Sequence, residues 1–316
     1  MPRLVNRSNF DSPHRRKILP LIMVIFILCI VGILGFFLYH IFSPSPKFLP
    51  ETEKNSMNKL PSDVKQSLKK QVQSATISAT LAVPILMYHY VEYVKDKRDT
   101  ERQLLDVTPN VFEKQIQILI SAGYSFITAK DLGDILDGKE QPPEKPIILT
   151  FDDGHWDLDT VVLPILKKYN IRATAYIIPG FIGKNTDSLS IQEMQDVVSS
   201  GLIDIGAHTV HHISLKGKLP ATVQYEVGES KRMLEQQYNI HVYSFAYPNG
   251  SFDKQAIDIV RQDGFTTAAS TIAGAQQNNL NRFFLYRIRP GSQTGQTLLK
   301  YIKYRESMPQ KLSYKN

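Results

Sequence analysis

The sequence predicts an α/β fold, a TIM-like (β/α) barrel of seven or eight strands preceded by a single transmembrane helix. Three observations predict it. An apolar stretch without a charged residue occupies positions 18–42. From Val83 onward, short strand-like runs alternate with helix-like segments, and this alternation implies parallel strands joined by helical crossovers. Polar residues directly follow several of these runs, at the strand ends where barrels of this kind carry their chemistry.

The first predicted element is a membrane anchor. At about 1.5 Å per residue, a helix over 18–42 is long enough to cross a hydrocarbon core of roughly 30 Å. Basic residues dominate 1–17, so we expect this tail to stay in the cytoplasm and the rest to be exported. A cleaved signal peptide is the competing interpretation, but no A-x-A-like site ends the stretch. Cys29, the only cysteine, lies inside it, so the exported part has no disulfide.

Residues 43–80 mix Lys, Gln, Ser and Asn with little apolar periodicity, which is typical of a solvated stalk. Residues 1–17 carry a net charge of +4 and residues 43–80 carry +3, which together account for the whole +7 of the chain. The remaining segment, 81–316, is therefore neutral, whereas nucleic-acid binders need a basic face on the folded domain. We predict a cytoplasmic tail, an anchor, a stalk and one folded domain over 81–316, without a nucleic-acid partner.

The folded domain is expected to contain eight strands, at 84–88, 124–128, 146–151, 173–178, 202–207, 242–247, 265–270 and 283–288. Helical patterns with recognisable ends lie between them. Thr108 followed by Pro109 predicts a helix start, and Ser190 with Glu193 forms a capping box before a helix that Gly201 ends. About 230 residues in seven or eight such units fit a barrel better than an open sheet, although the pattern does not exclude the sheet.

Four predicted strands run directly into polar or special-backbone residues: His89, Asp152-Asp153-Gly154, His208, and Pro248-Asn249-Gly250. Two carboxylates after a buried strand are costly unless they are paired or bind a metal. The alternative is that Asp152 and Asp153 only cap the following helix. These positions predict a polar site at one end of the barrel.

His208 and His212 are four residues apart, so on one helical turn they would point the same way. This spacing is common among metal ligands, and two imidazoles with one carboxylate leave an open position that suits a hydrolytic metal. His211 would point elsewhere, as a solvated or supporting residue. The sequence thus predicts a metal centre made by Asp153, His208 and His212.

Three motifs in order, "TFDDG" (150–154), "HTVHH" (208–212) and "FAYPNG" (245–250), resemble those of the polysaccharide deacetylases, the NodB-homology or carbohydrate esterase family 4 group. "PILMYHYV" (84–91) and "LYRIRP" (285–290) are similar to flanking segments of the poly-N-acetylglucosamine deacetylase-like branch. The resemblance covers about residues 83–290. It implies a distorted (β/α) barrel that removes acetyl groups from glycans with a divalent metal, usually Zn²⁺, with Co²⁺ or Ni²⁺ as alternatives.

The resemblance also implies roles, carried over by position. Asp153, His208 and His212 would bind the metal, and Asp152 would be the general base that takes a proton from the attacking water. The backbone N–H of Asn249 would donate to the oxyanion. Tyr247, on the same loop, is expected to line the substrate site.

The sequence departs from the family at two positions. Many members have an Arg where this chain has Ala246, so the catalytic Asp needs another support, for which Arg287 is the candidate. Many also have a late His that protonates the leaving amine, and this chain has no His after His241. His89 is the predicted acid and His155 the alternative, unless His89 is a buried structural residue.

Trp156, the only tryptophan, is predicted to form a wall for a sugar ring, with burial in the barrel rim as the alternative. We expect a membrane-anchored, extracytoplasmic enzyme that deacetylates N-acetylglucosamine units of peptidoglycan or an exopolysaccharide. An O-acetyl esterase or another amidase on the same scaffold is the first alternative. A glycan-binding protein with impaired catalysis is the second; Ala246 and the missing late His favour it, and the intact Asp152 argues against it.

Overall fold

The computed structural model describes residues 80–96, 98–184 and 186–308, all within one compact unit, Gln71–Asn316. Across these residues, none of the helices combines the length and the apolar character that a membrane crossing needs. The predicted tail at 1–17, the anchor at 18–42 and the stalk up to residue 79 lie outside the described residues, so they stay predictions.

Parallel strands form a nearly closed ring in the order β10-β8-β7-β6-β5-β4-β2. The ring closes beside β10, where the Met87 N–H donates to the Ile288 carbonyl at 2.9 Å and the Ile288 N–H donates to the Ile85 carbonyl at 2.7 Å. β3 pairs with the first residues of β4. The predicted (β/α) barrel is confirmed, and the open-sheet alternative is wrong.

The predicted strands all form, most of them one or two residues shorter at an end. The observed strands are β1 (Leu81–Ala82), β2 (Ile85–Tyr88), β3 (Ser125–Ile127), β4 (Pro146–Asp153), β5 (Ala173–Ile177), β6 (Ile203–Ala207), β7 (Ser244–Ala246), β8 (Thr267–Ala273), β9 (Gln276–Gln277) and β10 (Leu285–Arg287). β1 and β9, which pair antiparallel outside the ring, were not predicted.

The ring is distorted on the side of β7 and β10. β7 shares a single residue pair with β6, Ala207 with Phe245. The register between β10 and β8 shifts between Leu285 and Arg287. Irregularities of this kind change the direction of side chains and are common near active sites.

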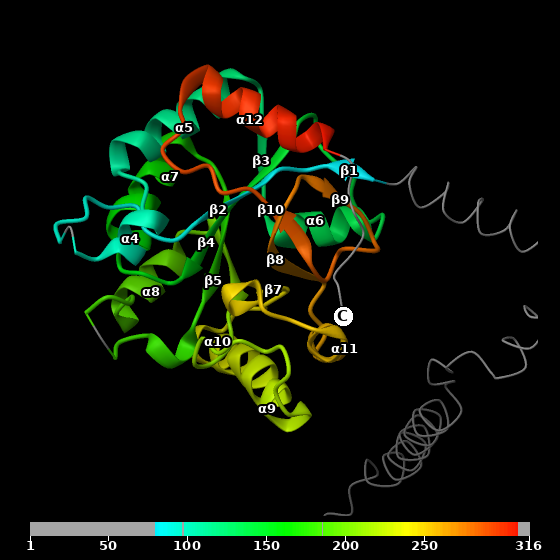
Figure 1. Cartoon of the computed structure of the whole chain (residues 1–316). Coiled ribbons are helices and arrows are strands. Elements are labelled where there is room, and N and C mark those ends of the chain that lie inside the picture. Colours follow the sequence, from blue (N-terminus) through cyan, green and yellow to red (C-terminus); the bar gives the residue numbers. More distant parts are fainter. Residues whose placement is uncertain (1–79, 97, 185, 309–316) are drawn as a thin grey trace, which may run out of the picture. The chain divides into compact units, whose positions relative to one another are not determined.

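Helices surround the strands (Figure 1). They are α4 (Thr100–Leu105), α5 (Pro109–Ser121), α6 (Ala129–Leu136), α7 (Leu163–Tyr169), α8 (Ile191–Ser199), α9 (Pro220–Gln224), α10 (Ser230–Tyr238), α11 (Lys254–Gln262) and α12 (Gly295–Ser307). The predicted capping box is present at α8, where the Ser190 N–H donates to the Glu193 carboxylate at 2.7 Å and the Glu193 N–H donates to Ser190 Oγ at 3.2 Å. α5 begins at Pro109 as predicted, although the side chain of Thr108 makes no capping bond.

The core fills the ring and the layer between the ring and the helices. β5 is buried at every residue, and β4 from Ile147 to Asp152. Because both faces of these strands are covered, their side chains cannot reach solvent except at the strand ends. The carboxyl end of β4 therefore carries its two aspartates to the open end of the barrel.

Candidate active site

The three predicted metal ligands converge at the end of the barrel. Asp153 ends β4, His208 directly follows β6, and His212 lies four residues further along the same loop. Asp153 Oδ1 is 3.3 Å from His208 Nε2 and 3.2 Å from His212 Nε2. One ligand atom from each residue lies within 4.8 Å of the others. The convergence that the sequence predicted is present, and the metal-binding role itself stays a prediction.

The reason for this convergence differs from the expected one. Residues 208–212 form a loop, so His208 and His212 do not lie on one helical turn as their spacing predicted. The loop turns instead through left-handed backbone at Thr209 (φ 62°) and His212 (φ 56°). Asp153 (φ 75°) and Asn249 (φ 58°) share this conformation, which non-glycine residues rarely adopt and which clusters at functional sites.

The hydrogen bond of His208 fixes how its ring faces Asp153. Nδ1 lies 2.7 Å from the carbonyl of Ala246, and because a carbonyl only accepts, Nδ1 carries the proton and Nε2 presents its lone pair. That lone pair faces Asp153 Oδ1, another acceptor. Asp153 Oδ1 is buried and has no hydrogen-bond partner among the described residues. A metal ion between these two atoms, or a proton on Nε2, would satisfy both.

The spacing of these atoms fits a divalent metal. Ligand bonds of about 2.0–2.1 Å at tetrahedral angles put donor atoms ~3.3 Å apart, close to the 3.2 and 3.3 Å separations from Asp153 Oδ1. Two imidazoles and one carboxylate match the donor set of catalytic zinc sites with an open fourth position. The residues therefore fit a metal ion of this class without setting which ion it is.

Glu226 holds the histidine loop, and sequence reasoning missed it. Its carboxylate accepts hydrogen bonds from the backbone N–H groups of Val210 (2.9 Å) and His211 (3.0 Å), and it contacts His211 Nδ1 at 2.8 Å. His211 thus supports the loop and does not face the metal position. The sequence contains a signal for the burial of Glu226: it lies three residues after Val223 and next to Val227, which are both apolar and buried on the same side of the helix.

Asp152, the predicted base, is held by Arg287. Arg287 Nη1 and Nη2 donate to Oδ1 and Oδ2 of Asp152 at 2.7 and 2.8 Å, and both side chains are buried. Burial by itself would raise the pKa of Asp152, but the charge and hydrogen bonds of Arg287 hold it below its usual range. The support that the sequence predicted from Arg287 in place of an Arg at position 246 is present.

Each of the two candidate acids lies beside a different member of the aspartate pair. His89 Nε2 is 3.9 Å from Asp152 Oδ2, and burial lowers the pKa of His89. His155 Nε2 is 3.5 Å from Asp153 Oδ2, and its ring stacks on Tyr90 with centroids 3.9 Å apart. His155 therefore contacts Asp153, the predicted metal ligand, whereas His89 lies beside Asp152, the predicted base.

A cavity of ≈ 540 Å³ opens over this cluster. Its walls are His89, Tyr90, Glu101, Leu104, Leu105, Asp152, Asp153, His155, Ile178, Phe181, Asp187, Ser188, His208, His212, Tyr247, Asn249, Thr271 and Arg289. Its volume is in the range of sites for small ligands. All predicted catalytic and metal-binding residues thus face one chamber.

Of the three predicted substrate contacts, Tyr247 and Asn249 line the catalytic cavity and Trp156 does not. Tyr247 lines the cavity, but its ring is fully buried and its hydroxyl donates to the Phe283 carbonyl at 3.0 Å, so it does not offer that hydroxyl to a ligand. Trp156 is absent from the walls of this cavity and lines a neighbouring one of ≈ 450 Å³. Asn249 lines the catalytic cavity as predicted, with its side-chain amide donating to Ser214 Oγ at 3.2 Å.

Comparisons with known proteins find one matching family model and several similar chains. Residues 139–268 match the family model described as polysaccharide deacetylase. Over 223 residues the chain is 29% identical to YxkH of Bacillus subtilis (strain 168), which is named among the polysaccharide deacetylases; the match covers 70% of this chain and 76% of that one. A poly-beta-1,6-N-acetyl-D-glucosamine N-deacetylase of Staphylococcus aureus (strain MSSA476) is 27% identical over 61% of this chain and 71% of its own length.

A solved structure is similar as well. The deacetylase PplD of Streptococcus pyogenes, in complex with acetate, superposes with a TM-score of 0.64 at 29% identity, covering 70% of this chain and 98% of that one. The matched family region contains Asp152, Asp153, His208 and His212, and Arg287 lies beyond its end.

Proposed function

We propose that the chain is a polysaccharide deacetylase that hydrolyses the N-acetyl groups of N-acetylglucosamine units in a cell-envelope or extracellular polysaccharide. The name of the Staphylococcus aureus relative favours poly-β-1,6-N-acetylglucosamine over peptidoglycan as the polymer. The products are acetate and a glycan with a free amine.

One observation carries the proposal: a buried carboxylate held by an arginine, Asp152 with Arg287, lies beside three convergent ligand side chains in a single cavity. Asp153, His208 and His212 would hold a divalent metal, which would act as a Lewis acid on the acetyl carbonyl and the water. Arg287 keeps the carboxylate of Asp152 ionised and fixes its orientation. Asp152 then accepts the proton of the attacking water.

The remaining groups act on the oxyanion and the leaving group. The backbone N–H of Asn249, at the cavity wall, donates to the oxygen that becomes negative during attack. His89 gives a proton to the leaving nitrogen, since it lies beside Asp152 and faces the cavity. His155 orients Asp153 through its contact with Oδ2.

The test is acetate release by the full-length protein from β-1,6-linked N-acetylglucosamine oligomers with added Zn²⁺ or Co²⁺. We expect release by the wild type and loss of at least a hundredfold in Asp152→Asn. Lys130→Gln serves as the matched control, because Lys130 forms a partly exposed ion pair with Asp134. No release by the wild type, or equal release by Asp152→Asn, contradicts the proposal.

The same assay separates the alternatives. Release from acetylxylan without release from the N-acetylated oligomer would assign an O-acetyl esterase. Saturable binding of the oligomer without release would assign a glycan-binding protein. Release from peptidoglycan fragments alone would assign peptidoglycan as the substrate polymer, with the same deacetylation reaction.

We also propose that residues 18–42 anchor the enzyme as a single-pass protein with the catalytic domain outside the cytoplasm. The support is the uncharged apolar stretch behind a basic tail. Alkaline carbonate extraction of cells should leave the protein in the membrane, and protease added to spheroplasts should digest the domain. A mature chain whose mass lacks this stretch would assign a cleaved signal peptide instead.

A further inference from the structure

A buried glutamine, Gln115, joins three segments of the chain beside the catalytic residues. α5 buries four of its residues, and Gln115 is the polar one among them. Its Nε2 donates to the carbonyls of Gly291 at 2.8 Å and Gln293 at 2.7 Å, and its Oε1 accepts from the Tyr88 hydroxyl at 2.9 Å. Both hydrogens of the amide are thus used, so Gln115 fixes the positions of its three partners relative to one another.

These partners lie on the two sides of the place where the ring of strands closes. Tyr88 ends β2, and the two carbonyls follow β10, which carries Arg287. The backbone of Ile288 joins β2 to β10 by a pair of hydrogen bonds. Gln115 adds a side-chain connection at the carboxyl ends of these strands, where the catalytic residues lie.

Tyr88 passes this connection on to His89, the residue that follows it. Tyr88 is the register partner of Phe151 on β4, and the two rings stack with their centroids 5.3 Å apart. Successive side chains of a strand point to opposite faces, so the next residues, His89 and Asp152, lie side by side on the other face. The distance of 3.9 Å between His89 Nε2 and Asp152 Oδ2 agrees with this. The position of Tyr88 against Phe151 thus sets the position of His89 beside the base.

Hydrogen bonds define this position more narrowly than apolar packing does. Gln115 is fully buried and Tyr88 is 1% exposed, and buried polar groups are costly to leave unpaired. Because hydrogen bonds are also directional, the three bonds of Gln115 favour a single placement of β2 relative to the segment after β10. Proton transfer depends on such placement, since a donor must come within about 2.6–3.2 Å of the accepting atom.

From these contacts we infer that Gln115 is a positioning residue for His89. Through Tyr88 it holds the imidazole where a proton passes to the leaving nitrogen. As the C–N bond of the acetamide breaks, its electron pair stays on that nitrogen, which takes the proton of His89. Asp152 then returns to His89 the proton that it accepted from water. The inference rests on the proposed function, in which His89 is the proton donor. It adds that this step depends on a side chain that is absent from the walls of the catalytic cavity.

Two substrates with different leaving groups provide the readout. The nitrogen of an N-acetylglucosamine unit needs a proton from the enzyme in order to leave, whereas para-nitrophenyl acetate releases a stable phenolate that needs none. A displaced proton donor therefore slows amide hydrolysis selectively, and a general structural defect slows both reactions. Full-length variants are assayed with Zn²⁺ on the β-1,6-linked N-acetylglucosamine oligomer and on the ester, below the temperature at which circular dichroism shows unfolding. The ester hydrolysis that remains in Asp152→Asn is subtracted as background.

The expected losses follow from the contribution of a general acid. Such a group contributes about 10²–10⁴-fold to a rate, so His89→Ala should lower kcat for the oligomer by at least that lower figure and leave ester hydrolysis nearly unchanged. Gln115→Leu should lower kcat for the oligomer about tenfold, with KM and ester hydrolysis unchanged, because a displaced imidazole keeps part of its effect. Tyr88→Phe removes the hydroxyl and keeps the ring on Phe151, so it should show the same selective loss with less disturbance of the fold. Gln115→Leu combined with His89→Ala should be no slower than His89→Ala alone.

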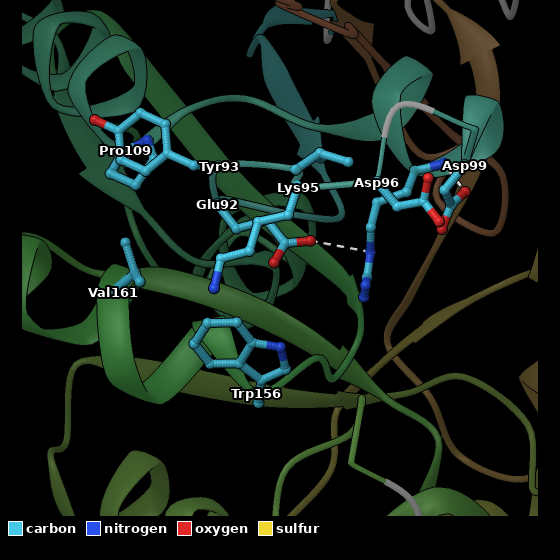
Figure 2. A pocket seen from close by; sticks show the side chains of 10 residues that line it. Glu92, Tyr93, Lys95, Asp96, Asp99, Pro109, Trp156 and Val161 are labelled. Carbon is cyan, nitrogen blue, oxygen red and sulfur yellow. Dashed lines mark hydrogen bonds and ion pairs between the residues drawn. The ribbon is translucent and has the colours of Figure 1, made fainter.

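Each substitution has a matched control. Gln277 is another fully buried glutamine whose side-chain amide donates to backbone carbonyls, and it is absent from the walls of the catalytic cavity. Gln277→Leu should therefore lower Tm and leave the ratio of the amide and ester rates unchanged. Tyr93→Phe is the control for Tyr88→Phe, because Tyr93 also follows β2 but is 56% exposed and lines a neighbouring cavity with Trp156 (Figure 2). It should match the wild type on both substrates.

Two results would overturn the inference: equal losses on both substrates in Gln115→Leu and Tyr88→Phe, or amide-to-ester ratios in both variants equal to those of their controls. If Gln115→Leu does not fold, Tyr88→Phe decides alone. If His89→Ala keeps the wild-type ratio, His89 is not the proton donor, and the inference falls with that role. Absence of acetate release by the wild type from every N-acetylated glycan would instead refute the proposed function, and the inference with it.

Discussion

Replacing Arg287 by Met tests the support of the catalytic carboxylate. Arg287 is fully buried and donates four hydrogen bonds: two to Asp152, one to the Ser270 carbonyl at 2.7 Å and one to Thr150 Oγ1 at 3.1 Å. Met fills a similar elongated volume without a donor. The substitution therefore leaves an unpaired carboxylate in a site where Asp152 is 3% exposed.

The expected cost follows from that burial. Breaking a buried ion pair by removing one partner costs about 3–5 kcal/mol. For a domain of this size each kcal/mol lowers Tm by about 2–4 °C, so we expect a drop of about 6–20 °C. The carboxylate also loses its direction, and a misplacement of about 1 Å can cost a hundredfold in rate, so acetate release should fall by that order.

Thermal unfolding and acetate release of the full-length variants measure both effects. Arg172→Met is the matched control, because Arg172 binds Asp131 through a pair in which the arginine is 46% exposed. Such pairs contribute about 0–1 kcal/mol. Arg287→Lys keeps the charge but not the two-pronged geometry, so it should lie between wild type and Arg287→Met in both assays.

A double-mutant cycle then isolates the pair. Arg287→Met combined with Asp152→Asn removes both charges, so the double variant should be more stable than the sum of the single losses predicts. If Arg287→Met unfolds within 2 °C of Arg172→Met, or if the two substitutions are additive, the reasoning about this buried pair is refuted.

Three further predictions concern other parts of the fold. Burial raises the pKa of the Asp204 carboxyl to about 7. Between about pH 4 and 7 the folded state therefore keeps a proton that the unfolded state loses, so stability falls as pH rises through this range. Asp204→Asn should raise Tm at pH 8 and leave it unchanged at pH 4. A Cβ on Gly180 would lie 2.1 Å from the Val210 carbonyl oxygen, inside the histidine loop, so Gly180→Ala should lower acetate release at least tenfold. Gly228→Ala should not, because its Cβ would meet only the side-chain ends of Asp263 and Gln224, at 3.1 and 3.2 Å. Glu226→Gln weakens the loop support and should lower zinc affinity by about 10–100-fold in a calorimetric titration, and an unchanged affinity would refute that role.

Much of the fold could be predicted because it depends on local pattern. Apolar runs bounded by turn residues located the ring strands, and the Ser190–Glu193 pair located the start of α8. The two-residue strands β1 and β9 could not be predicted, since two residues carry no periodicity. The closure of the ring at Leu86 and Ile288 depends on long-range pairing that no local signal contains.

The candidate site, like the fold, could be predicted from the sequence only in part. Residues at strand ends were placed correctly, because parallel strands bring their carboxyl ends to one side. The turns at Thr209 and His212 could not be foreseen, since neither residue favours left-handed backbone. The burial of the Tyr247 ring could have been predicted, because Tyr247 lies two residues after the buried Phe245 and alternate residues of an extended segment share a face.

Metal binding to the full-length protein tests the central claim most directly. Calorimetric titration of EDTA-treated wild type with Zn²⁺ should show a single ion bound per chain, and Asp153→Asn, His208→Ala and His212→Ala should each abolish or greatly weaken that binding while His211→Ala retains it. Wild type that binds no zinc, or ligand variants that bind it as tightly as wild type does, would contradict the account.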